Sequence, residues 1–250
     1  MNYREKLAVQ SYCYRGTGDN ADVAAKVKEC GFAGIELCGR HVDFSDESTF
    51  DSIIETYTSA GVDIVSIGVC RFANDEAAER KLFEFARKAG CPTISADFAI
   101  DATPACYRTA EKLADEYDVK LGIHNHGGRH WLGSAQALGH VFAQTGPRIG
   151  LMLDTAWALH SHEDPIAVAE RFADRLYGLH VKDFVFDKTG QHRDVVVGTG
   201  CLDMPRLFNL LDGAGFDGQV ILEYEGDVDN PVPALKECGD AIAKAGEERK

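Results

Sequence analysis

The sequence contains no uninterrupted apolar run of about 18 residues, the length at which a segment becomes a candidate membrane-spanning helix. Its first residues, MNYREKLAVQ, are polar and charged, so we expect no secretory signal and a cytoplasmic location. The eight cysteines include no Cys-x-x-Cys pair. We therefore expect reduced thiols, not a zinc ribbon or a disulfide scaffold. These absences predict a globular protein with no membrane partner.

Basic residues are scarce relative to acidic ones. The chain has 26 Lys and Arg against 40 Asp and Glu, which gives a net charge of −14, and no basic block offsets this excess. A nucleic-acid backbone or an anionic membrane surface repels such a chain, so we expect neither as the main partner. A small phosphorylated substrate stays compatible with the composition, because a local cluster of cations can oppose the global charge.

Eight short apolar segments recur along the chain, and each is continuous and not alternating. They are centred near Leu7, Ile35, Ile64, Ile94, Leu121, Leu151, Leu179 and Ile221. Neighbouring centres lie 27 to 30 residues apart, except for the last two, which are 42 apart. Continuous apolar runs are typical of strands that are covered on both faces.

Helix-like stretches follow the apolar segments, over residues 20–31, 46–61, 74–90, 103–117, 134–146, 163–175, 203–215 and 231–246. Asn20 is a candidate N-cap, and glycines close the first three stretches. Eight strand-then-helix units predict an α/β fold, a (β/α)8 TIM barrel that spans residues 1–250 as a single domain. An open doubly wound sheet is the alternative, but CYRGTGDN lacks the third glycine of a dinucleotide fingerprint.

Four consecutive strands of this barrel end in residues that bind divalent cations: His124, Asp154, His180 and Glu223. Adjacent strands lie about 4.8 Å apart, so these side chains can converge on one ion. Two imidazoles with two carboxylates suit Mn²⁺, Co²⁺, Fe²⁺ or Zn²⁺. Taken singly, each residue has an ordinary structural explanation. Asp154 could cap a helix, for example, and Glu223 could pair with Lys182.

The motifs LGIHNHGG, LMLDTAW, GLHVKDF and GFDGQVILEYEG resemble the sugar phosphate isomerase/epimerase superfamily, the xylose isomerase-like TIM barrels. The resemblance spans nearly the whole chain. It implies that Asp154, His180 and Glu223 are metal ligands and that Lys182 contacts a substrate oxygen. The sequence departs from the family at His124, where many members have Glu in an E-N-H motif. In ketose epimerases that Glu and the one at position 223 form the proton-transferring pair.

Three functions are compatible with this resemblance. The first is a carbohydrate isomerase or epimerase that uses one divalent metal ion and an enediolate. The second is a metal-dependent keto-sugar dehydratase or lyase that works by β-elimination, which HNH in place of E-N-H favours. The third is an endonuclease IV-like DNA-repair nuclease, against which the net charge of −14 counts strongly.

Several residues near the predicted strand ends are candidates for catalysis or substrate binding. We expect Glu223, Lys182 and His126 to be catalytic, and Glu36, Trp157 and Arg193 to bind substrate, with Arg193 in a long loop that closes over it. His126 shares the face of His124 by the two-residue strand period but lies beyond the strand. The expected partner is a small carbohydrate, and exposed barrel helices leave a homo-oligomer open.

Overall fold

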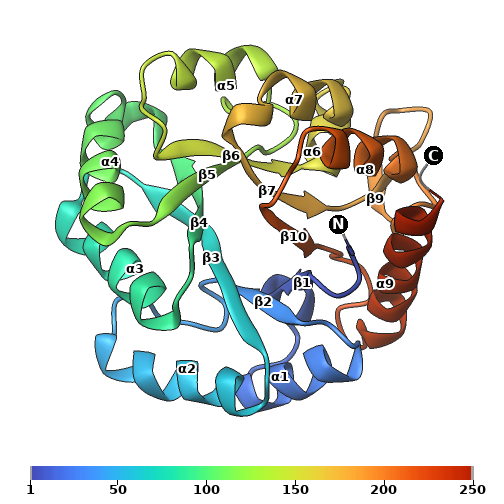
Figure 1. The fold of residues 1–250 in the computed structure, drawn as a ribbon, viewed down its shortest axis with the longest axis horizontal. Helices are drawn as coiled ribbons and strands as arrows, with labels where there is room; N and C mark the ends of the chain where they lie inside the picture. Colours follow the sequence, from blue (N-terminus) through green and yellow to red (C-terminus); the bar gives the residue numbers. More distant parts are fainter. Residues whose placement is uncertain (1, 249–250) are drawn as a thin grey trace.

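Eight parallel strands close into a barrel with helices around it (Figure 1), in a computed structural model that describes residues 2–248. The barrel strands are β1 (Leu7–Gln10), β2 (Gly34–Leu37), β3 (Asp63–Phe72), β4 (Thr93–Phe98), β5 (Lys120–His124), β6 (Ile149–Asp154), β7 (Leu176–Val181) and β10 (Gln219–Leu222). Each strand pairs with the next along the chain, and β10 pairs with β1. The predicted (β/α)8 barrel is confirmed.

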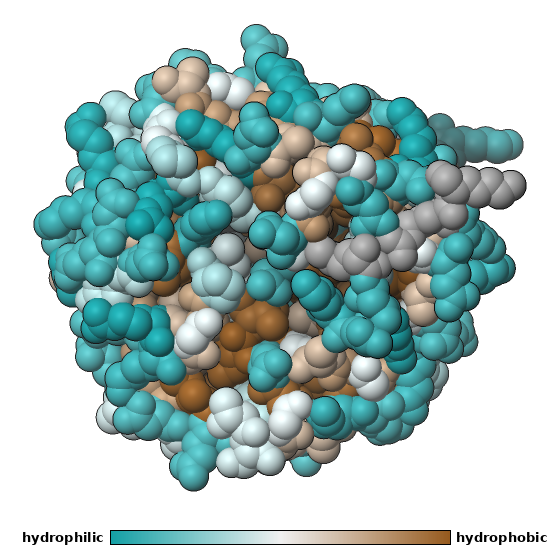
Figure 2. All heavy atoms as spheres, viewed as in Figure 1, coloured by the Kyte–Doolittle hydropathy of each residue, from teal (hydrophilic) through white to brown (hydrophobic). Residues whose placement is uncertain are grey.

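Eight helices form the outer ring: α1 (Asn20–Glu29), α2 (Phe50–Ser59), α3 (Glu76–Ala89), α4 (Ala105–Tyr117), α5 (Ala135–Phe142), α7 (Pro165–Arg171), α8 (Met204–Gly213) and α9 (Val232–Glu247). Short 3-10 turns lie at Ser11–Tyr14, Glu47–Thr49, Ile100–Ala102 and Ala173–Arg175. In Figure 2, hydrophilic side chains cover much of the ring, and hydrophobic residues show in the gaps between them. Within residues 2–248, no helix combines the length and the apolar character needed to cross a bilayer.

The starts of α1 and α2 show how the helix boundaries differ from the sequence prediction. The cap of α1 is Asp19 and not Asn20, because the Asp19 carboxylate accepts hydrogen bonds from the second and third residues of the helix. The stretch predicted to begin at residue 46 opens as a 3-10 turn, and α2 starts only at Phe50. The α3 prediction agrees well, since Asp75 caps its start and Gly90 adopts the left-handed conformation at its end.

The barrel interior has an apolar layer beneath a polar one. Ala8, Met152 and Ile221 form a small buried cluster apart from the main core, which lies between strands and helices. Gly178 makes room for Met152, because a Cβ at this position would lie 2.5 Å from the Met152 sulfur. Met152 and Ile221 are the larger side chains of this layer. The same strands lead to the polar residues Gln10, Asp154 and Glu223 at the mouth of the barrel.

The interval between β7 and α8, predicted as one long loop, contains a small antiparallel hairpin of β8 (Phe184–Phe186) and β9 (His192–Asp194). Asp183 fixes the segment that follows the hairpin. Its carboxylate accepts hydrogen bonds of 2.8 to 3.0 Å from the backbone N–H groups of Gly198, Gly200, Cys201 and Leu202. A further short helix, α6 (Thr155–His160), follows β6 directly. Both additions lie next to the strand ends that carry the candidate ligands.

Candidate metal centre

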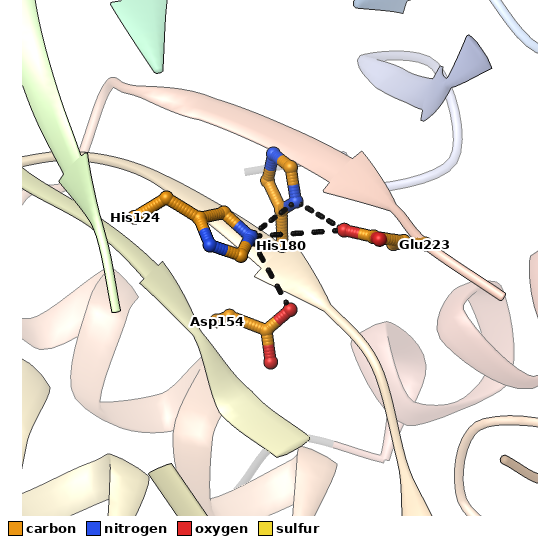
Figure 3. Close-up of side chains that lie close together, drawn as sticks. All are labelled: His124, Asp154, His180 and Glu223. Atoms are coloured by element: carbon orange, nitrogen blue, oxygen red, sulfur yellow. Dashed lines mark hydrogen bonds and ion pairs between the residues drawn. The ribbon is translucent and has the colours of Figure 1, made fainter. Parts of the chain in front are cut away.

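Four buried side chains meet at the carboxyl ends of neighbouring strands (Figure 3). His124 ends β5, Asp154 ends β6, His180 lies in β7, and Glu223 comes directly after β10. One donor atom from each residue lies within 4.8 Å of the other three. Parallel pairing creates this convergence, since Asp154 stands opposite His180 in the register between β6 and β7.

The distances between these donor atoms suit a single cation. His124 Nε2 lies 3.1 Å from His180 Nδ1, 3.5 Å from Asp154 Oδ2 and 3.7 Å from Glu223 Oε2. His180 Nδ1 lies 2.6 Å from Glu223 Oε2. Donor atoms that share one ion at about 2.1 Å, with angles of about 90 to 109°, lie about 3.0 to 3.4 Å apart.

Asp154 provides the strongest indication of a cation. One carboxylate oxygen, Oδ1, accepts a 2.7 Å hydrogen bond from Trp157 N and so caps α6. The other oxygen, Oδ2, is buried, faces His124 and has no hydrogen-bond partner. A buried carboxylate oxygen without a partner is costly unless a cation compensates it. Asp154 therefore does cap a helix, as its position alone could suggest. The cap uses only Oδ1 and leaves Oδ2 available as a metal ligand.

Asn125, which the sequence analysis did not single out, fixes Asp154 from the neighbouring strand. Its side-chain amide donates to Asp154 O at 2.9 Å and accepts from Asp154 N at 2.8 Å. This two-way bond continues the pairing of β5 with β6 beyond the last residue of β5. The sequence did contain a signal for this role, because Asn125 lies between His124 and His126 in the HNH motif. A buried Asn at such a position needs hydrogen-bond partners of its own.

Glu36 holds the far side of the His180 ring. Its Oε1 lies 2.9 Å from His180 Nε2, while Gln10 and Ser95 donate hydrogen bonds of 2.5 and 2.6 Å to its two oxygens. Burial alone lowers the pKa of His180, but the carboxylates of Glu36 and Glu223 outweigh this effect and raise it to about 10. Glu36 is fully buried and bonded to protein groups, so its geometry differs from that of the expected substrate contact.

Lys182 is fully buried beside the centre and does not line the cavity at the mouth. Its Nζ lies 3.4 Å from Glu223 Oε1, donates to Glu225, and stands 5.3 Å from the ring centre of Trp157. Burial alone raises the pKa of Glu223, but Lys182, His124 and His180 lower it well below its usual range. In this position Lys182 contacts the carboxylates and not the space where a substrate would bind.

His126 borders the centre on the side of β5. Its ring centre lies 4.7 Å from that of His124 and 6.5 Å from that of Trp157, and its Nδ1 is buried without a hydrogen-bond partner. Burial, together with the neighbouring His124 and His130, lowers the pKa of His126 to about 4. The imidazole is therefore neutral at neutral pH, with one nitrogen able to accept a proton.

A cavity of about 330 Å³ opens above the four donors. The lining residues are Gln10, Tyr12, Cys38, Gly39, Arg40, Gly68, Val69, His124, His126, Trp157, Glu223 and Glu225. Two of the three predicted substrate-binding residues lie elsewhere. Glu36 sits below the cavity floor, and Arg193 is exposed on β9, where the alternation of the strand turns it away from the inward-facing His192. Gln10, Tyr12 and Arg40 line the cavity and were not singled out from the sequence.

Several known proteins resemble this chain in sequence. The family model described as "Xylose isomerase-like TIM barrel" matches residues 24–244. An inosose dehydratase of Geobacillus kaustophilus is 27% identical over 214 residues, which cover 78% of this chain and 69% of that protein. An inosose dehydratase of Clostridium beijerinckii is 26% identical over 131 residues, 46% of this chain. The chain spans less than half of that second relative, 44% of its length.

Solved structures share the fold. An L-ribulose 3-epimerase superposes with a TM-score of 0.75 at 16% identity, covering 97% of this chain and 95% of that one. The probable 3-DHS dehydratase AsbF of Bacillus anthracis gives a TM-score of 0.74 at 16% identity, covering 98% of this chain and 100% of that one. At such identities the likeness shows the barrel and no particular reaction.

Proposed function

The chain belongs to the xylose isomerase-like TIM barrel family, and from this premise we propose that it is a carbohydrate-converting enzyme that uses one divalent cation. The observation that carries the proposal is the convergence of two imidazole nitrogens and two carboxylate oxygens, one of them Asp154 Oδ2, which accepts no hydrogen bond from residues 2–248. His124, Asp154, His180 and Glu223 would hold the ion. A divalent cation at this position would draw electrons from a ketone and a neighbouring hydroxyl, acidifying the carbon next to the ketone and stabilising an enediolate.

Among the cavity residues, His126 is the best candidate for moving the proton. Its imidazole is neutral, and Nδ1 has no hydrogen-bond partner among residues 2–248. Glu223 is a poorer base, since one of its oxygens faces the ligand cluster and the other faces Lys182. Lys182 keeps Glu223 ionised and acts through it, without touching the substrate.

We favour β-elimination as the outcome. His126 can take the proton from the carbon next to the ketone, and the electron pair of that C–H bond then forms a C=C bond as the β-hydroxyl leaves. The same imidazole returns its proton to the departing hydroxyl, so the products are an unsaturated ketone and water. One acid–base group on one face is sufficient for this sequence. The names of the two curated relatives, both inosose dehydratases, support the same assignment.

Isomerisation or epimerisation is the second candidate, and the sequence patterns favoured it. The family includes proteins of this kind, and an L-ribulose 3-epimerase shares the fold. Epimerisation needs a proton donor on the opposite face of the substrate, which Glu223 could supply only by giving up its contact with Lys182. Elimination needs no second proton donor and is therefore the favoured reaction.

Incubation of the metal-loaded protein with inososes, 3-keto-sugars and ketoses in D₂O separates the two outcomes. Elimination gives an unsaturated ketone that absorbs in the ultraviolet. Isomerisation or epimerisation gives a product that carries deuterium and has lost no water. In His126→Gln we expect kcat/KM to fall about 10²- to 10⁴-fold while the metal content stays the same. A fully active His126→Gln variant would contradict the assignment, and the absence of both products would contradict the proposed function.

A further inference from the structure

A second and larger cavity adjoins the one above the metal centre. Its volume is about 700 Å³, against about 330 Å³ for the first, and Gly39 and Val69 line both. Gly39 follows the end of β2, and Val69 lies near the end of β3. A molecule seated over the four donors and extending past these two residues therefore enters the second cavity, which we call the β2–β3 groove.

Part of the lining of the β2–β3 groove is apolar. Val69 is 37% exposed and is one of four large hydrophobic side chains that are exposed within residues 2–248. Phe44 also lines the groove, with its ring packed edge-on against Phe85 at 5.3 Å, and so do Ala78 and Leu82 of α3. Exposed apolar surface that is continuous with a reaction cavity is typical of a site that binds part of a ligand.

The charged side chains of the β2–β3 groove are mostly committed to the protein. Oε1 of Glu79 accepts hydrogen bonds from Ala73 N at 2.8 Å and Asp75 N at 3.1 Å. Lys81 donates to Ser45 O at 2.9 Å. Arg71 is exposed and makes no ion pair within the described part of the chain, so its guanidinium is available. A guanidinium stacks well on the face of an aromatic ring.

A cluster of three rings, packed edge-on or tilted against one another, lies at the Trp157 side of the first cavity. Trp157 lies 5.0 Å from Phe184 and 5.1 Å from His192 between ring centres, and Phe184 lies 4.4 Å from His192. On the β1 side, Arg15 donates to the carbonyl oxygens of Tyr12 and Glu225. A substrate longer than one sugar ring therefore extends toward β2 and β3.

From this arrangement we infer that the substrate is a polyhydroxylated ketone joined to an aryl group, with the sugar over the metal centre and the aryl ring in the β2–β3 groove. The inference rests on the proposed function for the sugar half only. The aryl half rests on the groove itself, namely its apolar lining residues, the exposed guanidinium of Arg71 and its continuity with the reaction cavity.

Matched pairs of methyl and phenyl glycosides test this inference by direct binding, because they keep the sugar ring and its hydroxyls but lack the ketone and so cannot react. We would measure, by calorimetry on the metal-loaded protein, both members of each pair for α- and β-glucosides and α- and β-galactosides. We expect at least one phenyl glycoside to bind about tenfold or more tightly than its methyl partner, because the ring buries apolar surface in the groove. Ala78→Trp, which fills the groove, should remove this gain and leave the affinity for the methyl glycoside unchanged.

Ala143→Trp is the matched control, because Ala143 is exposed and directly follows α5, across the barrel from α2 (Figure 1). It should keep the full preference for the phenyl glycoside. Equal affinities within every pair, no binding of any glycoside, or a preference that survives Ala78→Trp would overturn the inference. The D₂O assay described above reports separately on the proposed function. Either of its two products without a phenyl preference would reject only the aryl site in the groove, and a phenyl preference without either product would reject only the proposed chemistry.

Discussion

The two sides of the barrel mouth differ in what they present. Strands β5, β6, β7 and β10 supply all four candidate ligands, which are buried and tied to further polar groups beneath them. Strands β2 and β3 end instead in Gly39 and the exposed Val69, beside an apolar groove. A buried polar network tolerates little change, because each lost partner leaves a charge uncompensated, whereas an exposed apolar wall can vary freely. On this molecule, one side is suited to fixing the reaction and the other to choosing the substrate.

The largest effect is expected from Asp154→Asn, which tests whether the polar side holds a metal. The amide oxygen can still cap α6, but the amide nitrogen would replace Oδ2 and point a donor at the cluster. We expect the affinity for Mn²⁺ or Co²⁺ to fall at least about 100-fold, since ligand losses exceed the roughly 10- to 100-fold cost of losing a supporting partner. Calorimetry and elemental analysis measure the change.

Asp217→Asn, an exposed substitution, controls for the general loss of a negative charge. The Ala78→Trp variant of the groove should also keep its metal, because the β2–β3 side holds none of the ligands. Equal metal affinity in Asp154→Asn and in the wild type would contradict the assignment of metal binding to the polar side of the mouth.

Glu36→Gln tests the support beneath His180 and should have the next largest effect. Glutamine keeps the shape and an acceptor for the His180 N–H but removes the charge that faces the ring. We expect metal affinity to weaken about 10- to 100-fold, as for other partners of ligating histidines, and the visible spectrum of bound Co²⁺ to shift. Ser95→Ala, which removes only a hydrogen bond to Glu36, should have a smaller effect. An unchanged affinity and spectrum in Glu36→Gln would show that His180 is positioned without Glu36.

The pH dependence of metal binding follows from His180. In the metal-free protein its pKa is raised to about 10, so at neutral pH the imidazole carries a proton that a metal ion must displace. Lowering the pH therefore weakens binding, and we expect the dissociation constant to rise about tenfold for each pH unit between about 9 and 7. Titrations in buffers of different ionisation enthalpy count the proton released. A dissociation constant independent of pH over this range would mean that His180 is not a ligand.

The smallest effect is expected from Arg193→Ala, although this residue is on the hairpin next to the polar side. Its side chain is exposed and is not among the residues that line the cavity. We expect kcat/KM to stay within about twofold of the wild-type value, as is usual for surface substitutions away from a site. A tenfold rise in KM would instead support the loop closure that the sequence suggested for Arg193.

The convergence of His124, Asp154, His180 and Glu223 was predictable because it depends on one rule, that the ends of parallel strands meet at one mouth. The position of each residue after an apolar segment was sufficient to apply that rule. The environments of Glu36 and Lys182 were not predictable in the same way. Glu36 lies within β2 and Lys182 directly follows β7, but their partners, His180 and Glu225, come from distant parts of the chain.

The sequence alone determined the barrel and the set of polar residues at its mouth, because spacing and apolar patterning are local properties of the chain. Only the tertiary structure decided which of these residues face one another and which face the cavity. It turned Glu36 toward His180, buried Lys182 between carboxylates and left one oxygen of Asp154 without a partner. The physical reason is that the pairing of buried charges depends on distances of a few ångströms between strands, which strand order and register set together.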